Sequence, residues 1–84
     1  MEMLVCESDS SKPISFTDEE IKHLNNEELV GLLEATVVGI DYRISCFVRS
    51  SSWSFLDEIG MLNLGRKALQ KETLHRLKKV RERL

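Results

Sequence analysis

Two helix N-terminal signals follow one another directly in this sequence of 84 residues. Thr17 precedes Glu20 by three residues, the spacing of a capping box, in which the threonine oxygen and the glutamate carboxylate each accept a backbone N–H of the other residue. Asn25 and Glu28 repeat this spacing at once. The two boxes predict a short helix over about 17–24 that turns directly into a second helix.

The second helix is predicted to carry one long apolar stripe. Its residues recur at steps of three and four: Leu29, Leu33, Val37, Ile40, Ile44 and Phe47. A strand is the alternative over residues 37–48, because apolar residues there also alternate and many are β-branched. We favour the helix, because the cap defines its start and the stripe continues without a break, although Gly39 inside it costs about 1 kcal/mol relative to alanine.

Two further helices are expected after the serines at 50–52. A short third helix would place Trp53, Leu56 and Ile59 on one face and end at Gly60. We expect Trp53 to be buried in the core; the alternative is that Trp53 and Phe55 form an exposed binding surface. After a turn through Asn63 and Gly65, a last helix would begin near Arg66, with one apolar side made by Leu69, Thr73, Leu77, Val80 and Leu84.

The N-terminal segment shows no sustained period and mixes serines and acidic residues with the only proline, Pro13. We therefore expect residues 1–15 to be a disordered tail. The predicted fold class is all-α: a small four-helix domain over residues 16–84 with a disordered N-terminal tail. Because a chain this short buries only about 60–65% of its unfolded surface, its core is expected to be thin. A second copy of the chain is therefore one expected partner, in a homodimer.

The two cysteines, Cys6 and Cys46, are too few for a small secreted disulfide scaffold, and we expect reduced thiols. Together with His23 and His75 they lack the short spacing of a zinc site, so no metal and no cofactor is expected. No apolar run reaches the length of a membrane span and the N-terminus has no basic signal region. The expected protein is cytoplasmic, without membrane or small-molecule substrate, and not an enzyme.

Charge is distributed unevenly along the chain. From Arg66 to Leu84 eight basic residues stand against two acidic ones, whereas the preceding part has four basic and twelve acidic residues. Such a basic segment is typical of a protein that binds phosphate groups or an acidic protein surface. Its exposed cations are expected at Lys71, Lys78, Lys79, Arg81 and Arg83.

The run Asn63-Leu64-Gly65-Arg66-Lys67-Ala68-Leu69 resembles the second helix-hairpin-helix of the C-terminal domain of the bacterial RNA polymerase α subunit. The resemblance implies that Asn63, Gly65 and Lys67 contact DNA phosphates at a helix N-terminus, where free N–H groups form an anion site. Val48-Arg49-Ser50 resembles the stretch that carries the same family's minor-groove arginine, which implies a DNA contact for Arg49.

The stretch from Phe55 to Gly60, followed by Gly65-Arg66-Lys67, is similar to part of the small helical anti-sigma proteins of T-even phages. Both resemblances imply a small regulatory binding protein of the transcription machinery, with RNA polymerase among its potential partners. The nucleic-acid-binding residues of this hypothesis are Arg49, Asn63, Gly65, Arg66, Lys67, Lys71, Lys78 and Lys79.

A protein–protein adaptor or inhibitor is the alternative hypothesis. It would act through the apolar second helix, with a partner interface formed by Leu33, Val37, Ile40 and Ile44, and through the basic last helix, which would dock on an acidic protein surface.

Overall fold

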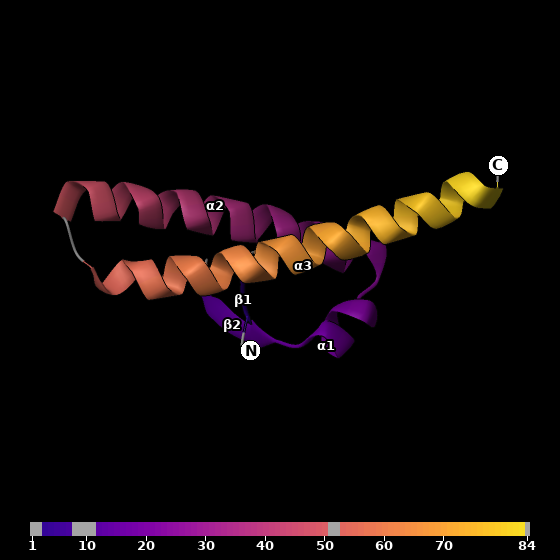
Figure 1. Cartoon of the computed structure of the whole chain (residues 1–84), viewed down its shortest axis with the longest axis horizontal. Helices are drawn as coiled ribbons and strands as arrows, with labels where there is room; N and C mark the ends of the chain where they lie inside the picture. The colour runs from indigo at the N-terminus through magenta and orange to yellow at the C-terminus, as the bar shows by residue number, and fades with distance from the viewer. Residues whose placement is uncertain (1–2, 8–11, 51–52, 84) are drawn as a thin grey trace.

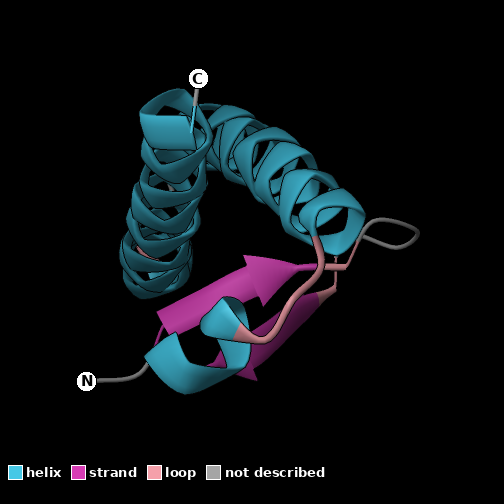
Figure 2. Cartoon of the chain, turned by 90° about the vertical axis from the view of Figure 1, so that its right-hand side faces the viewer, coloured by secondary structure: helices cyan, strands magenta, loops and turns pink. Residues whose placement is uncertain are grey.

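The computed structural model describes residues 3–7, 12–50 and 53–83. Five elements follow one another along the chain: β1 (Met3–Cys6), β2 (Pro13–Phe16), α1 (Asp18–Lys22), α2 (Asn26–Ser50) and α3 (Ser54–Arg83). The two long helices run antiparallel as a helical hairpin (Figure 1), and the strands and α1 lie together on one side of it (Figure 2). The described part of the chain therefore has two layers, and no described element covers the other side of the helical hairpin.

Both predicted capping boxes are confirmed. At the start of α1, Thr17 Oγ1 accepts the backbone N–H of Glu20 at 3.2 Å, and Glu20 Oε1 accepts that of Thr17 at 3.1 Å. Asn25 Oδ1 accepts the N–H of Glu28 at 2.8 Å, and Glu28 Oε1 accepts the N–H of Asn25 at 3.1 Å. These local bonds start each helix at the residue that the sequence predicts.

The helical interpretation of residues 37–48 is also confirmed, because α2 continues without a break to Ser50. Gly39 lies inside this helix, where β1 passes close to it. A Cβ atom at this position would lie 2.5 Å from Cys6 Sγ. Glycine is therefore used here for close packing between helix and strand, which offsets its low helix propensity.

The predicted disordered N-terminal tail is wrong, and with it the all-α fold class. β1 and β2 pair antiparallel, with Met3 opposite Phe16 and Cys6 opposite Pro13. Strands of four residues are too short to show a clear period in the sequence, and burial against the long helices stabilises them: Val5 and Cys6 are fully buried. Residues 8–11, also within the predicted tail, lie outside the described residues.

The predicted division into four helices is wrong as well, because the expected third and fourth helices form the single helix α3. Gly60 does not end a helix, and Asn63 and Gly65 lie inside α3 instead of forming a turn. Gly65 faces β1, where an added Cβ would overlap the carbonyl oxygen of Leu4. The glycine thus allows close packing on a strand that the sequence analysis did not expect. The serines at 51–52 and Leu84 lie outside the described residues.

The core lies between the two layers. Its buried cluster consists of Met3, Val5, Ile21, Leu29 and Leu69. One polar residue of α2, Thr36, is fully buried beside it: its Oγ1 accepts the N–H of Cys6 at 3.0 Å and donates to the carbonyl of Leu32 at 2.6 Å. This hydroxyl satisfies a backbone donor of β1 and so fixes the strand on α2.

The role of Gly65 can be tested against two other helical glycines. We expect Gly65→Ala to lower the free energy of unfolding by about 1–3 kcal/mol, because the new methyl group overlaps β1. Gly31→Ala and Gly60→Ala meet no atom within 4 Å and should instead raise it by up to about 1 kcal/mol through helix propensity. Urea denaturation followed by circular dichroism measures all three. A stabilised Gly65→Ala variant would contradict the close approach of β1.

Candidate functional site

The structure does not form the predicted phosphate site at residues 63–67. Gly65 is buried in the middle of α3, so its N–H belongs to the hydrogen-bond ladder of that helix. Asn63 Oδ1 accepts from Nε and Nη2 of Arg66 at 3.1 and 2.8 Å, and Arg66 Nη1 donates to Gln70 Oε1 at 2.8 Å. The polar side chains of this segment therefore bond to one another, and the unpaired N–H groups of a helix start are absent from residues 63–67.

Four predicted contact residues, Lys67, Lys71, Lys78 and Lys79, are exposed along α3. The first three follow at steps of four and seven residues, which places them on one side of the helix. Arg49 is exposed too, but it lies near the end of α2, whereas α3 carries Lys78 and Lys79 toward the opposite end of the molecule (Figure 1). The structure thus groups Lys67, Lys71 and Lys78 and separates Arg49 from Lys78 and Lys79.

The predicted interface residues Leu33, Val37, Ile40 and Ile44 form part of a longer stripe on α2. The stripe begins at Val30 and ends at Val48, and every member is half-buried or exposed. The residues of α2 that contact the strand layer belong to the neighbouring stripe of Thr36, Gly39 and Arg43. At 100° per residue, most of the apolar stripe is therefore turned away from the β-hairpin, although Leu33 also packs against the buried core.

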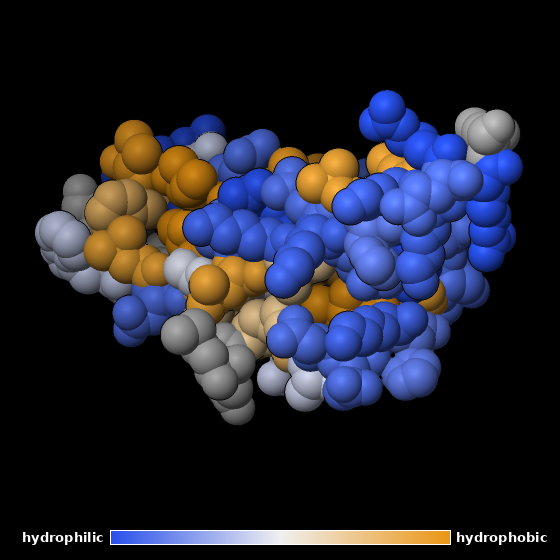
Figure 3. All heavy atoms as spheres, turned by 45° about the vertical axis from the view of Figure 1, so that its right-hand side comes forward, coloured by the Kyte–Doolittle hydropathy of each residue, from blue (hydrophilic) through white to orange (hydrophobic). Residues whose placement is uncertain are grey.

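A stripe of mixed polarity runs along the same side of α3, offset from Gly65, which faces β1. It contains Leu56 and Ile59 toward the start of the helix, Asn63, Arg66 and Gln70 in the middle, and Leu74 beyond them. We call the two stripes together the open face: Val30, Leu33, Val37, Ile40, Ile44 and Val48 of α2 with Leu56, Ile59, Asn63, Arg66, Gln70 and Leu74 of α3. Hydrophobic atoms gather toward the tip of the helical hairpin, and hydrophilic atoms toward the end of α3 (Figure 3).

The last part of α3 extends beyond α2. Arg76 marks the level of the α2 start: its guanidinium donates to Asn26 Oδ1 at 2.9 Å and to the carbonyl of Lys22 at 3.3 Å, and it pairs with Glu72 at 3.0 Å. Residues 77–83, which we call the basic arm, follow this anchor. Within the arm Leu77 and Val80 are each 55% exposed, although Lys78, Lys79, Arg81 and Arg83 surround them.

An apolar notch of about 210 Å³ lies where the basic arm leaves the helical hairpin. Its lining comes from the first turns of α2 and the end of α3: Asn26, Leu29, Val30, Thr73, Arg76, Leu77 and Val80. Leu77 and Val80 continue the side of α3 that packs on α2 earlier in the helix. Because α2 begins at the level of Arg76, it does not run alongside the arm and leaves them uncovered. The notch therefore combines uncovered apolar walls with adjacent positive charge.

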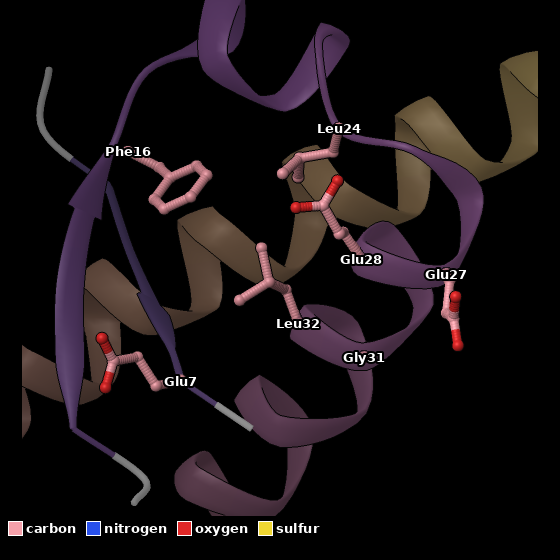
Figure 4. Close-up of a pocket in the computed structure, with 7 residues that line it drawn as sticks. All are labelled: Glu7, Phe16, Leu24, Glu27, Glu28, Gly31 and Leu32. Carbon is pink, nitrogen blue, oxygen red and sulfur yellow. The ribbon is translucent and has the colours of Figure 1, made fainter. Parts of the chain in front are cut away.

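A second hollow, of about 520 Å³, opens between the β-hairpin and the first half of α2. Phe16, Leu24 and Leu32 direct their side chains toward it, and Glu27 lies at its outer edge (Figure 4). The Glu28 carboxylate is already engaged in the capping box. Among the described side chains, no group of three or more His, Cys, Asp or Glu is arranged to hold a metal ion, here or elsewhere.

A buried charged group that the sequence analysis did not anticipate joins the two layers. Arg43 is buried and pairs with Glu58 of α3 at 2.6 Å, while Nη1 donates to the carbonyl of Gly39 at 3.0 Å and contacts Cys6 Sγ at 3.9 Å. Burial raises the pKa of the Cys6 thiol, and the positive charge of Arg43 opposes this shift. An arginine within a helical stripe carries no local signal of burial, because its partners come from distant parts of the sequence.

The two cysteines should differ in reactivity. At pH 8 we expect iodoacetamide to modify the half-buried Cys46 at least about tenfold faster than the buried Cys6. Burial limits the access of the reagent to Cys6, and the raised pKa of Cys6 lowers the fraction of its reactive thiolate. Mass spectrometry of a labelling time course measures the two rates. In the control variant Cys46→Ser, native protein should stay largely unlabelled until urea is added, and rapid labelling of this variant would contradict the burial of Cys6.

Comparison with known proteins adds no relative. No protein-family model, no curated protein and no solved structure matches this chain. Within the described residues, no helix has the length and apolar character that crossing a membrane requires. The case for a function therefore rests on the open face, the notch and the basic arm.

Proposed function

We propose that this protein is a protein-binding module, an adaptor or inhibitor, that captures an acidic amphipathic segment of another protein at the notch and the basic arm. The observation that carries the proposal is the position of an uncovered apolar notch directly beside a cluster of cations on one helix. An amphipathic helix docks by placing apolar side chains in such a groove. Acidic residues on the same helix would then meet the arm.

The anchor of the arm supports this proposal. Because Arg76 bonds to α1 and α2 through Lys22 and Asn26, the base of the arm is held in place before any partner binds. A preformed site loses less conformational entropy on binding than a flexible one. Arg81 and Lys78 lie on the exposed part of the arm, where charge attraction chiefly accelerates association and selects acidic partners.

Nucleic-acid binding is the second candidate, and the exposed Lys67, Lys71 and Lys78 on one side of α3 favour it. Phosphate contacts need cations and N–H groups, and they do not use uncovered leucine and valine side chains. The notch lined by Leu77 and Val80 therefore favours the protein partner. A link to transcription comes only from the two short sequence resemblances.

The proposal can be tested with a fluorescent synthetic peptide that forms an amphipathic helix of leucine and glutamate residues. The full chain should bind this peptide in fluorescence anisotropy, and Leu77→Ser should weaken binding about tenfold, because burying a leucine contributes about 1.5–3 kcal/mol. Leu64→Ser is the matched control, since Leu64 is a 37% exposed leucine of α3 outside the notch. Arg81→Glu should weaken binding and reduce its salt dependence.

Three outcomes would overturn the proposal. They are that the parent chain does not bind the peptide, that Leu77→Ser binds the peptide as tightly as the parent chain, or that Leu64→Ser weakens peptide binding as much as Leu77→Ser does. A 20-base-pair DNA duplex and anionic lipid vesicles serve as competing probes. Tighter binding of either one, unchanged by Leu77→Ser and reduced by Arg81→Glu, would replace the protein partner with phosphate recognition.

A further inference from the structure

The open face has flanks of opposite charge. Along α2 its outer flank carries the exposed acidic residues Glu27, Glu34 and Asp41, at steps of seven. Along α3 the corresponding flank carries the exposed basic residue Lys67, and Lys78 follows on the same side in the basic arm. The ion pairs Arg43–Glu58 and Arg76–Glu72 use no residue of either flank.

The contacts between α2 and α3 show which residues lie at the same level. Arg43 bonds to Glu58 and Asn26 bonds to Arg76, so the residue numbers at one level add up to 101 in the first pair and 102 in the second. By this relation Glu34 lies level with Lys67. The two residues cannot meet within one chain, because each lies on the outer flank of its own helix.

We infer that a second copy of this chain covers the open face, so that two helical hairpins form a four-helix bundle. In this dimer each α2 lies on α3 of the second copy, and the twofold axis runs along the helices. Rotation about such an axis causes no shift along it, so Glu34 of each copy comes to the level of Lys67 of the other. The Glu34 carboxylate of each copy then faces the Lys67 ammonium of the other, which makes two attractive pairs in the dimer.

Charge disfavours the other face-to-face arrangement. A twofold axis across the helices would place α2 on α2 and α3 on α3, so that Glu34 lies beside the acidic flank of the second α2 and Lys67 beside the same side of the second α3. Like charges at such flanking positions disfavour a pairing, and opposite charges select it. The net charge of −2 causes little overall repulsion between copies.

Apolar surface provides the driving force for this pairing. The stripe on α2 extends over 18 residue steps from Val30 to Val48, about 27 Å of helix at 1.5 Å per residue. At the tip, Ile44 lies level with the start of the α3 stripe at Leu56 of the second copy. Both residues are exposed in the single chain, and pairing removes them from water.

The experiment is sedimentation equilibrium of the full chain and four variants. We expect a dimer for the parent chain, and about tenfold weaker dimerisation for Glu34→Lys and for Lys67→Glu, because each change makes two repulsive pairs by symmetry. An equimolar mixture of the two variants should recover the parent affinity within about twofold, since both pairs in the heterodimer are then attractive. Only a second copy in the stated orientation predicts this recovery.

Val37→Glu and Val38→Glu test the face itself. Val37 belongs to the open face and is 38% exposed, whereas Val38 points away from it and is 61% exposed. We expect Val37→Glu to yield a monomer and Val38→Glu to dimerise like the parent, with circular dichroism confirming that both variants are folded. A monomeric parent chain at 100 µM, a mixture of charge variants that stays monomeric, or equal effects of Val37→Glu and Val38→Glu would each overturn the inference.

Val30 belongs to both the open face and the notch, but the residues changed to test the dimer, Glu34, Lys67 and Val37, lie outside the notch and the arm, so the two proposals can fail separately. The dimer alone is rejected if the Val37→Glu variant still binds the peptide and the mixture of Glu34→Lys and Lys67→Glu does not dimerise. A restored dimer that binds no acidic peptide would reject the proposed function alone.

Discussion

The fold depends on how closely β1 approaches the two long helices. The strand lies in the space between α2 and α3, and both helices have a glycine at the point of contact: Gly39 against Cys6, and Gly65 against Leu4. A strand of four residues has few side chains with which to stabilise its own pairing. Close approach allows Val5 to be fully buried and brings the Cys6 N–H within reach of Thr36, so the helices stabilise the strand.

A second constraint is the buried guanidinium of Arg43. A charge at this depth is unfavourable unless its donors are paired. Glu58 and the carbonyl of Gly39 both accept from it, which joins α2 to α3 at the level of the strand layer. Among the described residues, no buried side-chain nitrogen or oxygen lacks a hydrogen-bond partner. The pair sets the relative level of the two helices, and that level determines which residues of the open face lie beside each other.

The sequence predicts what local chemistry controls and misses what tertiary contacts control. The capping boxes at Thr17 and Asn25 act within one helical turn, so the helix starts could be predicted from residue spacing. Gly65 looks like a turn residue in the sequence, because Leu4, whose carbonyl requires a glycine there, is 61 residues away. The exposed lysines of α3 and the apolar stripe of α2 can be predicted, because both follow from helical periodicity. The hydrogen bonds of Arg66 to Asn63 and Gln70 cannot be predicted from the sequence, because water offers these side chains equally good partners.

The proposed dimer and the proposed partner can occupy the molecule together. Asn26 begins α2 at the level of Arg76, and a twofold axis along the helices keeps both copies at the same level. The basic arms therefore extend past the first turns of both α2 helices. Each notch is lined by the start of α2 and the end of α3 of a single copy, toward the end of the open face. Pairing through the open face would thus place two notches and two arms at one end of the bundle, where two acidic segments carried by one partner could bind together more tightly than either segment alone.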